Sequence, residues 1–97
     1  MQEYAMGFIE TYGYAAAVMA ADASLKAAAV RIVRIESTIG SGGSLGVTVF
    51  LSGEVAAIKA ALEAGCNAAE KIGRVVASNV IANLDHRVRQ GMYHNRI

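Results

Sequence analysis

The sequence predicts an α+β fold in which a four-stranded antiparallel sheet carries two helices on one face. Short β-branched or aromatic segments alternate with two longer segments whose apolar residues recur at helical spacing. Their order is strand, helix, strand, loop, strand, helix, strand, so the two halves are alike. A glycine-rich stretch at 39–46 separates them. A duplicated βαβ unit with right-handed crossovers gives a ferredoxin-like βαβ-βαβ α/β sandwich.

The first half begins with a short apolar segment at 4–10, which indicates a strand, and Gly13 then marks a tight turn. Apolar residues follow at spacings of three and four, which predicts a helix. We take one stripe as its apolar face: Tyr14, Val18, Ala21, Leu25 and Ala28. Alanines occupy the other faces and allow a neighbouring element to come close. The β-branched segment 30–36 is a second strand.

The second half repeats this order. Segment 47–52 indicates the third strand, and a second amphipathic helix follows from Val55 to Ile72. Segment 75–81 is the fourth strand. Beyond it, Leu84, Val88 and Met92 recur every four residues, which predicts a short C-terminal helix. We expect one domain over 1–97, with a core at about 4–81 and a tail at 82–97. Since both helices cover one sheet face, we expect the tail or a neighbouring subunit to cover the other.

The composition indicates a homo-oligomer. Apolar residues, with glycine counted and tyrosine left out, make up about 61% of the 97 residues, against roughly 45–50% in soluble domains. A small domain with this surplus usually buries it against a partner. A net charge of +1 gives no case for nucleic acid, and a single cysteine, Cys66, fits a reducing compartment. Without a long apolar run or a signal-like start, we expect neither membrane association nor export.

Catalytic chemistry has no evident place in this sequence. His86 and His94 lie in the tail, far along the chain from Cys66, and the carboxylates are scattered. A catalytic or metal site needs such groups to converge, so we expect no enzyme, no metal and no cofactor. The glycine-rich stretch lacks the third glycine of a dinucleotide-binding loop and the lysine of a P-loop, so we do not expect a nucleotide site.

Several segments, in this order and spacing, resemble the single-domain hexameric shell proteins of bacterial microcompartments, the BMC shell protein family. The similarity extends over about residues 4–81. The residues that carry it are Ala5-Met6-Gly7-Phe8-Ile9-Glu10-Thr11-x-Gly13, Ala20-Ala21-Asp22-x-x-x-Lys26-Ala27-Ala28-x-Val30, Ile39-Gly40-Ser41-Gly42, Val47-Thr48-Val49-x-x-x-Gly53-Glu54-Val55-Ala56-Ala57-Ile58-Lys59-Ala60-Ala61, Ala64-Gly65 and Asn79-Val80-Ile81.

This resemblance implies a flat homohexamer that tiles into a self-assembling shell around metabolic enzymes in the bacterial cytoplasm. A central pore passes small polar metabolites. The expected pore loop comprises Ile39, Gly40, Ser41, Gly42, Gly43, Ser44, Leu45 and Gly46. The expected partners are other shell proteins and the enclosed enzymes. The resemblance places Lys26 at the lateral edge where hexamers meet, and we assign Asp22 and Arg87 to the same edge.

Two departures from the family pattern have consequences for this expectation. The chain between Glu36 and Val47 is about four residues longer than the usual pore loop, which favours a catabolic compartment, a metabolosome, over a carboxysome. After Ile81 the family commonly continues Pro-Arg-Pro, whereas this chain has Ala82-Asn83-Leu84, so Arg87 or Arg89 must serve at the edge. The alternative function is a ferredoxin-like regulatory module that binds an anionic small molecule on the glycine loop. A hexamer that forms sheets favours the shell protein, and a metabolite-stabilised dimer or trimer favours the regulator.

Overall fold

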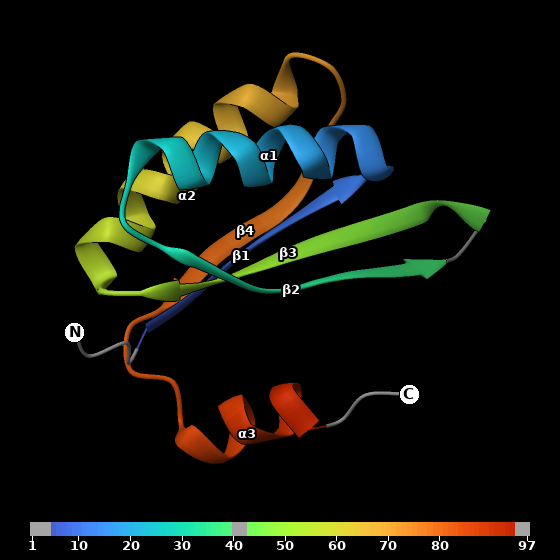
Figure 1. Ribbon diagram of the computed structural model, residues 1–97. Helices are drawn as coiled ribbons and strands as arrows, with labels where there is room; N and C mark the ends of the chain where they lie inside the picture. The colour runs from blue at the N-terminus through green and yellow to red at the C-terminus, as the bar shows by residue number, and fades with distance from the viewer. Residues whose placement is uncertain (1–4, 40–42, 95–97) are drawn as a thin grey trace.

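The structure of the chain is a computed structural model that describes residues 5–39 and 43–94. Its elements are β1 (Ala5–Tyr12), α1 (Tyr14–Ala27), β2 (Arg31–Ile39), β3 (Leu45–Gly53), α2 (Val55–Glu70), β4 (Val75–Ile81) and α3 (His86–His94). The strands form one antiparallel sheet in the order β2-β3-β1-β4. Helices α1 and α2 lie side by side on one face of the sheet, and α3 lies on the opposite face (Figure 1).

This arrangement confirms the predicted fold class, including the short C-terminal helix. Helix α3, which the tail forms, covers the sheet face opposite α1 and α2 (Figure 1). The sequence predicts the tail or a neighbouring subunit on this face. Strand β4 has the predicted bounds, whereas the other three strands continue past their predicted ends because the ladders persist. Thus β1 still pairs with β3 at Tyr12 opposite Gly46. Among the described residues, none of the helices has the length and apolar character needed to span a bilayer.

The core lies between the two helices and the sheet. Alternate residues of β1 and β3 point into it, since side chains alternate between the two faces of a strand. Ile9, Val47, Val49 and Leu51 are fully buried there, together with Ile58 of α2. The predicted amphipathic helix is found as α2, and Ile58, Leu62, Gly65 and Ala69 form its buried face. Ile72, its predicted last residue, lies past the end of the helix and is exposed.

Helix α1 turns a different face to the core than its large apolar residues indicate. Tyr14, Val18 and Leu25 are exposed, and the buried face consists of small residues: Ala16, Ala17, Ala20, Ala21 and Ser24. The cause is the close approach of α2. A Cβ placed on Gly65 would meet Ser24 and would lie 2.9 Å from the Ala20 carbonyl oxygen. Only small side chains fit at this distance, so the large ones point away from the core.

Candidate pore loop and edge residues

The predicted pore loop coincides with the β2–β3 hairpin, but the loop itself is shorter than the sequence suggested. Ile39 is the last residue of β2 and pairs with Leu45, and Thr38 pairs with Gly46. Ile39, Leu45 and Gly46 are therefore strand residues, which corrects the prediction of a continuous loop from 39 to 46. The reason is the backbone ladder, which β-branched and aliphatic residues extend to the connection at 40–44.

The hairpin uses its glycines in two ways. Gly43 has a φ of 83°, a conformation that side-chain-bearing residues rarely adopt, so the connection turns there. Gly46 is a residue of strand β3, and a Cβ at this position would lie 2.9 Å from a carboxylate oxygen of Glu10. Ser44 is exposed. Gly40, Ser41 and Gly42, which are also predicted pore residues, lie outside the described residues.

The end of the hairpin projects from one end of the sandwich, beyond the helices that cover the sheet (Figure 1). Its apolar residue Ile39 is 72% exposed, the largest exposed fraction among the exposed large apolar residues of the described chain. Thr38 beside it is also exposed. A projecting tip of this kind buries little of its own surface, so it is available for contact with other molecules.

The structure brings together two of the three predicted edge residues. Lys26 Nζ lies 3.0 Å from Asp22 Oδ2, one turn apart on α1, with 77% and 58% of the two side chains exposed. An exposed pair of this spacing contributes only about 0.3–0.5 kcal/mol to folding. Arg87 lies on α3, on the other side of the sheet, so it does not join the pair (Figure 1).

Arg87 binds within the tail instead. Its Nε and Nη2 donate to the two carboxylate oxygens of Asp85, at 3.0 and 2.7 Å. The backbone N–H of Arg87 also donates to Asp85, at 2.8 Å. The Arg87 side chain, followed by its backbone N–H, lowers the pKa of Asp85 from 3.8 to about 2. Asp85 thus caps the start of α3.

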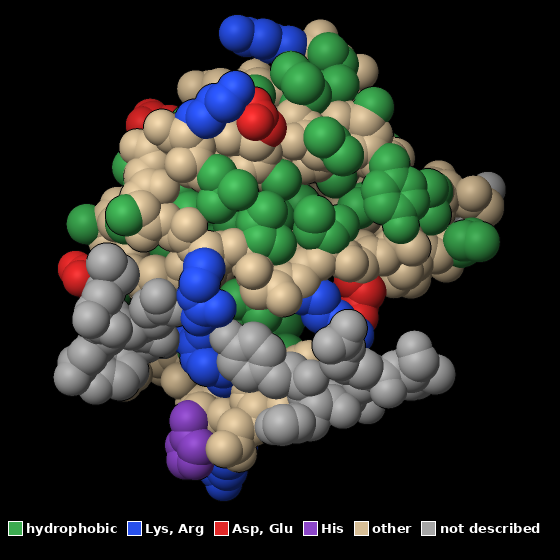
Figure 2. Space-filling view, in the orientation of Figure 1, with side chains coloured by type: hydrophobic (Ala, Val, Ile, Leu, Met, Phe, Trp, Pro, Cys, Tyr) green, Lys and Arg blue, Asp and Glu red, His purple; other side chains and the backbone are tan. Residues whose placement is uncertain are grey.

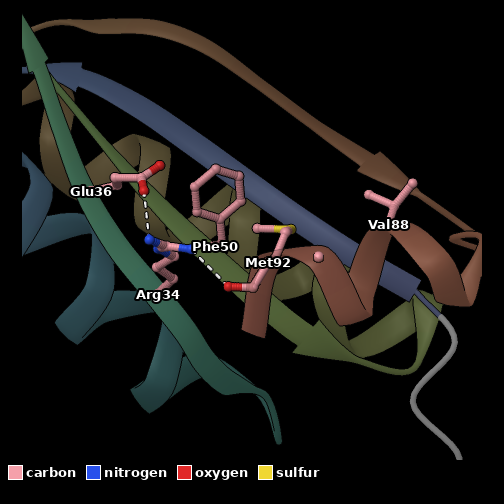
Figure 3. A pocket seen from close by; sticks show the side chains of 6 residues that line it. Arg34, Glu36, Phe50, Val88 and Met92 are labelled. Carbon is pink, nitrogen blue, oxygen red and sulfur yellow. Dashed lines mark hydrogen bonds and ion pairs between the residues drawn. The ribbon is translucent and has the colours of Figure 1, made fainter. Parts of the chain in front are cut away.

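Sequence reasoning missed two arginines that hold α3 on the sheet. Arg89 donates to Ser52 Oγ at 2.8 Å and to the Ala5 carbonyl oxygen at 3.2 Å. Arg34 of β2 donates to the Met92 carbonyl oxygen at 2.7 Å and lies 2.9 Å from Glu36 (Figure 3). The alternation of side chains along strands could have predicted that Arg34 and Phe50 point to the same face of the sheet. Nothing in the sequence predicts the contact between Arg34 and Met92. Arg89, considered above for the shell edge, is already used to anchor the helix.

The described residues form no metal-binding cluster. No three histidine, cysteine or carboxylate side chains converge among them. Cys66 is half-buried against the core, and it is a free thiol. His86 is exposed at the start of α3, and the side chain of His94 lies outside the described residues. Hydrogen bonding satisfies every buried side-chain nitrogen and oxygen in the part of the chain that the structure describes.

Comparison with known proteins identifies the family. The family model of the BMC domain matches residues 5–84, which include the whole sandwich. The chain belongs to the BMC domain family.

The relatives within the family are shell proteins. The chain is 49% identical over 81 residues to the bacterial microcompartment shell protein PduA of Salmonella typhimurium, covering 84% of this chain and 82% of PduA. It is 46% identical over 77 residues to the shell protein EutM of Escherichia coli K12, and the match covers 79% of this chain and 75% of EutM. The carboxysome shell protein CsoS1B of Halothiobacillus neapolitanus is 45% identical over 85 residues, and the match covers 87% of this chain and 74% of CsoS1B.

A solved structure has the same fold. The crystal structure of a microcompartments protein from Desulfitobacterium hafniense DCB matches 93% of this chain with a TM-score of 0.78 and 31% sequence identity. This chain spans about half the length of that protein, 49%. A match over this share of the chain agrees with the α+β sandwich described above.

Proposed function

We propose that this chain is a structural shell protein of a bacterial microcompartment in the cytoplasm. Six copies form a ring, the rings tile edge to edge, and small polar metabolites cross the shell through the central pore. The observation that carries this proposal is the similarity, over 84% of the chain, to PduA, a bacterial microcompartment shell protein. EutM and CsoS1B are shell proteins as well, so the similarity favours a structural component over an enzyme.

Exposed apolar residues on two opposite sides of the chain support a ring. On one side they lie on α1 and the edge strand β2: Tyr14, Val18, Met19, Leu25, Ile35 and Ile39. Figure 2 shows hydrophobic side chains gathered in a band across this side of the molecule. On the other side, Ile72, Val76 and Ile81 are exposed at and beside the opposite edge strand, β4. A closed ring joins unlike patches of neighbouring copies, and two patches on opposite edges meet that requirement.

The functional surfaces follow from this ring. The β2–β3 hairpin, residues 39–46, surrounds the pore, and Asp22 with Lys26 lies at the edge between hexamers. Arg87 was assigned to that edge, and we retain it as a contact from the opposite face of the sheet. The whole chain, 1–97, forms one shell domain with a core at about 4–81 and a tail at 82–97. Its further partners are other shell proteins and the enclosed enzymes.

The assembly state of the purified protein tests the proposal. Native mass spectrometry at micromolar concentration should show six copies, and electron microscopy should show extended sheets or tubes. A stable monomer would contradict the shell function. A dimer or trimer that one metabolite stabilises would instead indicate the regulatory module.

A matched pair of lysine variants tests the edge. Lys26→Ala should leave the hexamer intact and abolish sheets, because its pair with Asp22 is too weak to affect folding. Lys71→Ala, which removes another exposed lysine from the end of α2, should leave the sheets unchanged. If both variants form sheets equally well, Lys26 is not an edge contact.

A further inference from the structure

Helix α3 is attached to the sandwich mainly by polar contacts. The hydrogen bonds described above, from Arg34 to Met92 and from Arg89 to Ser52 and Ala5, join it to β1, β2 and β3. Two of its apolar side chains contribute little, since Val88 is 51% exposed and Met92 is only half-buried. The Asp85 cap is formed within the tail, by hydrogen bonds from Arg87.

A space remains between α3 and the sheet. A cavity of about 370 Å³ is lined by residues of β2, β3 and α3: Arg34, Glu36, Phe50, Val88, Gly91 and Met92 (Figure 3). Gly91 stands in the middle of α3, where a Cβ would meet nothing within 4 Å. A glycine inside a helix destabilises it, and here the bare position also leaves the cavity unfilled. The contact between α3 and the sheet is therefore loose compared with the closely packed face under α1 and α2.

The sheet face under α3 is apolar near its centre. Gly7 faces α2, since a Cβ there would meet Ile58 and Leu62, so its neighbours Met6 and Phe8 point to the α3 side. Phe8 packs against Phe50 with ring centroids 6.5 Å apart. Met6 is only 2% exposed but does not belong to the main core cluster. Its ladder partner is Ser52, the residue that Arg89 binds, so the Arg89 side chain lies beside Met6.

From this geometry we propose that α3 is a lid that opens as a unit while the sandwich stays folded. Arg34 and Arg89 hold it shut, and opening uncovers an apolar surface made of Met6, Phe8 and Phe50. The core does not take part, because its buried residues lie on the other face of the sheet. Proteins open locally where few apolar contacts hold a segment, and α3 meets that condition. The lid controls access to the second sheet face, and the inference does not depend on the shell assignment.

Hydrogen exchange and methionine oxidation in the full-length protein test the lid. In the unmodified protein, amides of α3 should exchange at least about 100-fold faster than those of β1 and β3 in the core. Arg89→Ala should accelerate both α3 exchange and peroxide oxidation of Met6 by about tenfold or more, because it removes two hydrogen bonds made by a charged group. Exchange of the core amides should not change. Met19, already exposed on α1, provides the internal reference for oxidation.

Arg87→Ala is the matched control, since this arginine lies on the same helix and binds Asp85 within the tail. It should change Met6 oxidation by less than about twofold. The lid is refuted if α3 and the core exchange at the same rate in the unmodified protein, which requires no variant to fold. It is also refuted if Arg87→Ala exposes Met6 as much as Arg89→Ala does.

Discussion

At the scale of single residues, the contact between α1 and α2 depends on Gly65. A Cβ at this position would meet Ser24, the Ile9 side chain at 2.8 Å and the Ala20 carbonyl oxygen at 2.9 Å. The carbonyl oxygen belongs to the backbone and cannot move away cheaply. We expect Gly65→Ala to destabilise the fold by about 1–2 kcal/mol, even though alanine favours the helix. Urea unfolding of the variant and the parent protein measures the difference.

The same substitution at Gly91 is the control. Gly91 also lies inside a helix, but a Cβ there meets open space, so Gly91→Ala should not lower the midpoint of unfolding. It should slow the exchange of the α3 amides, because alanine favours the helix by up to about 1 kcal/mol. A Gly65→Ala variant as stable as the parent would show that the two helices separate without cost.

Asp85 links the start of α3 to acidity. Its pKa is about 2 in the folded protein against 3.8 for an ordinary aspartate, because Arg87 donates to it through its side chain and its backbone N–H. Because the pKa of Asp85 is lower in the folded than in the unfolded state, its ionised carboxylate stabilises the cap at pH values above the unfolded-state pKa. This contribution is lost as the pH falls from about 4 through 2. We expect the Arg87 amide to lose protection in that range. NMR titration of the Asp85 carboxyl should have a midpoint near 2, and a midpoint near 3.8 would contradict the cap.

At the scale of elements, the sequence identified each strand and helix but not the core-facing side of α1. Spacing alone cannot choose between a stripe of large residues and a stripe of alanines, since both recur at helical intervals. The choice depends on how near α2 approaches, and that distance follows from Gly65, forty residues away from Leu25. For α2 no such conflict exists, because Ile58 and Leu62 are both the large residues and the buried ones.

The exposed face of α1 predicts an effect on assembly rather than on folding. Val18 is 58% exposed, so Val18→Glu removes little apolar burial from the chain itself. If this face contacts a neighbouring copy, the variant buries an unpaired carboxylate there and should weaken the hexamer by at least about tenfold in affinity. Ala60→Glu, on the exposed face of α2, is the control and should leave assembly unchanged. Sedimentation over a concentration series compares the two variants.

The tail shows why part of the candidate site could not be predicted. Periodicity of Leu84, Val88 and Met92 indicated a helix, and the uncovered sheet face indicated where it goes. Its anchoring depends on Arg34 and Arg89, whose partners are a distant hydroxyl and distant carbonyl oxygens. Backbone carbonyl groups carry no sequence signal, so contacts of this kind appear only in three dimensions. For the same reason the sequence could not show that Arg87, assigned to the same edge as Lys26, lies on the opposite side of the sheet from it.

At the scale of the whole molecule, the projecting hairpin gives a test of where the six copies meet. If residues 39–46 surround a six-fold axis, Ser41→Asp brings six carboxylates close together, and their mutual repulsion raises the pKa above about 3.9. The ring should then bind cations, and anion passage should fall while folding stays nearly unchanged. A peripheral hairpin would instead keep the six groups far apart.

NMR titration of the Ser41→Asp hexamer therefore measures the position of the hairpin directly. At the axis, the carboxylates should titrate at least about one unit above 3.9, over a broadened range, and added salt should reduce the shift because it screens the repulsion. Asn67→Asp, which adds one carboxylate to an exposed position on α2, should titrate near the ordinary value with little response to salt. A Ser41→Asp hexamer that titrates like this control would place the hairpin away from the axis, although the hexamer itself would stand.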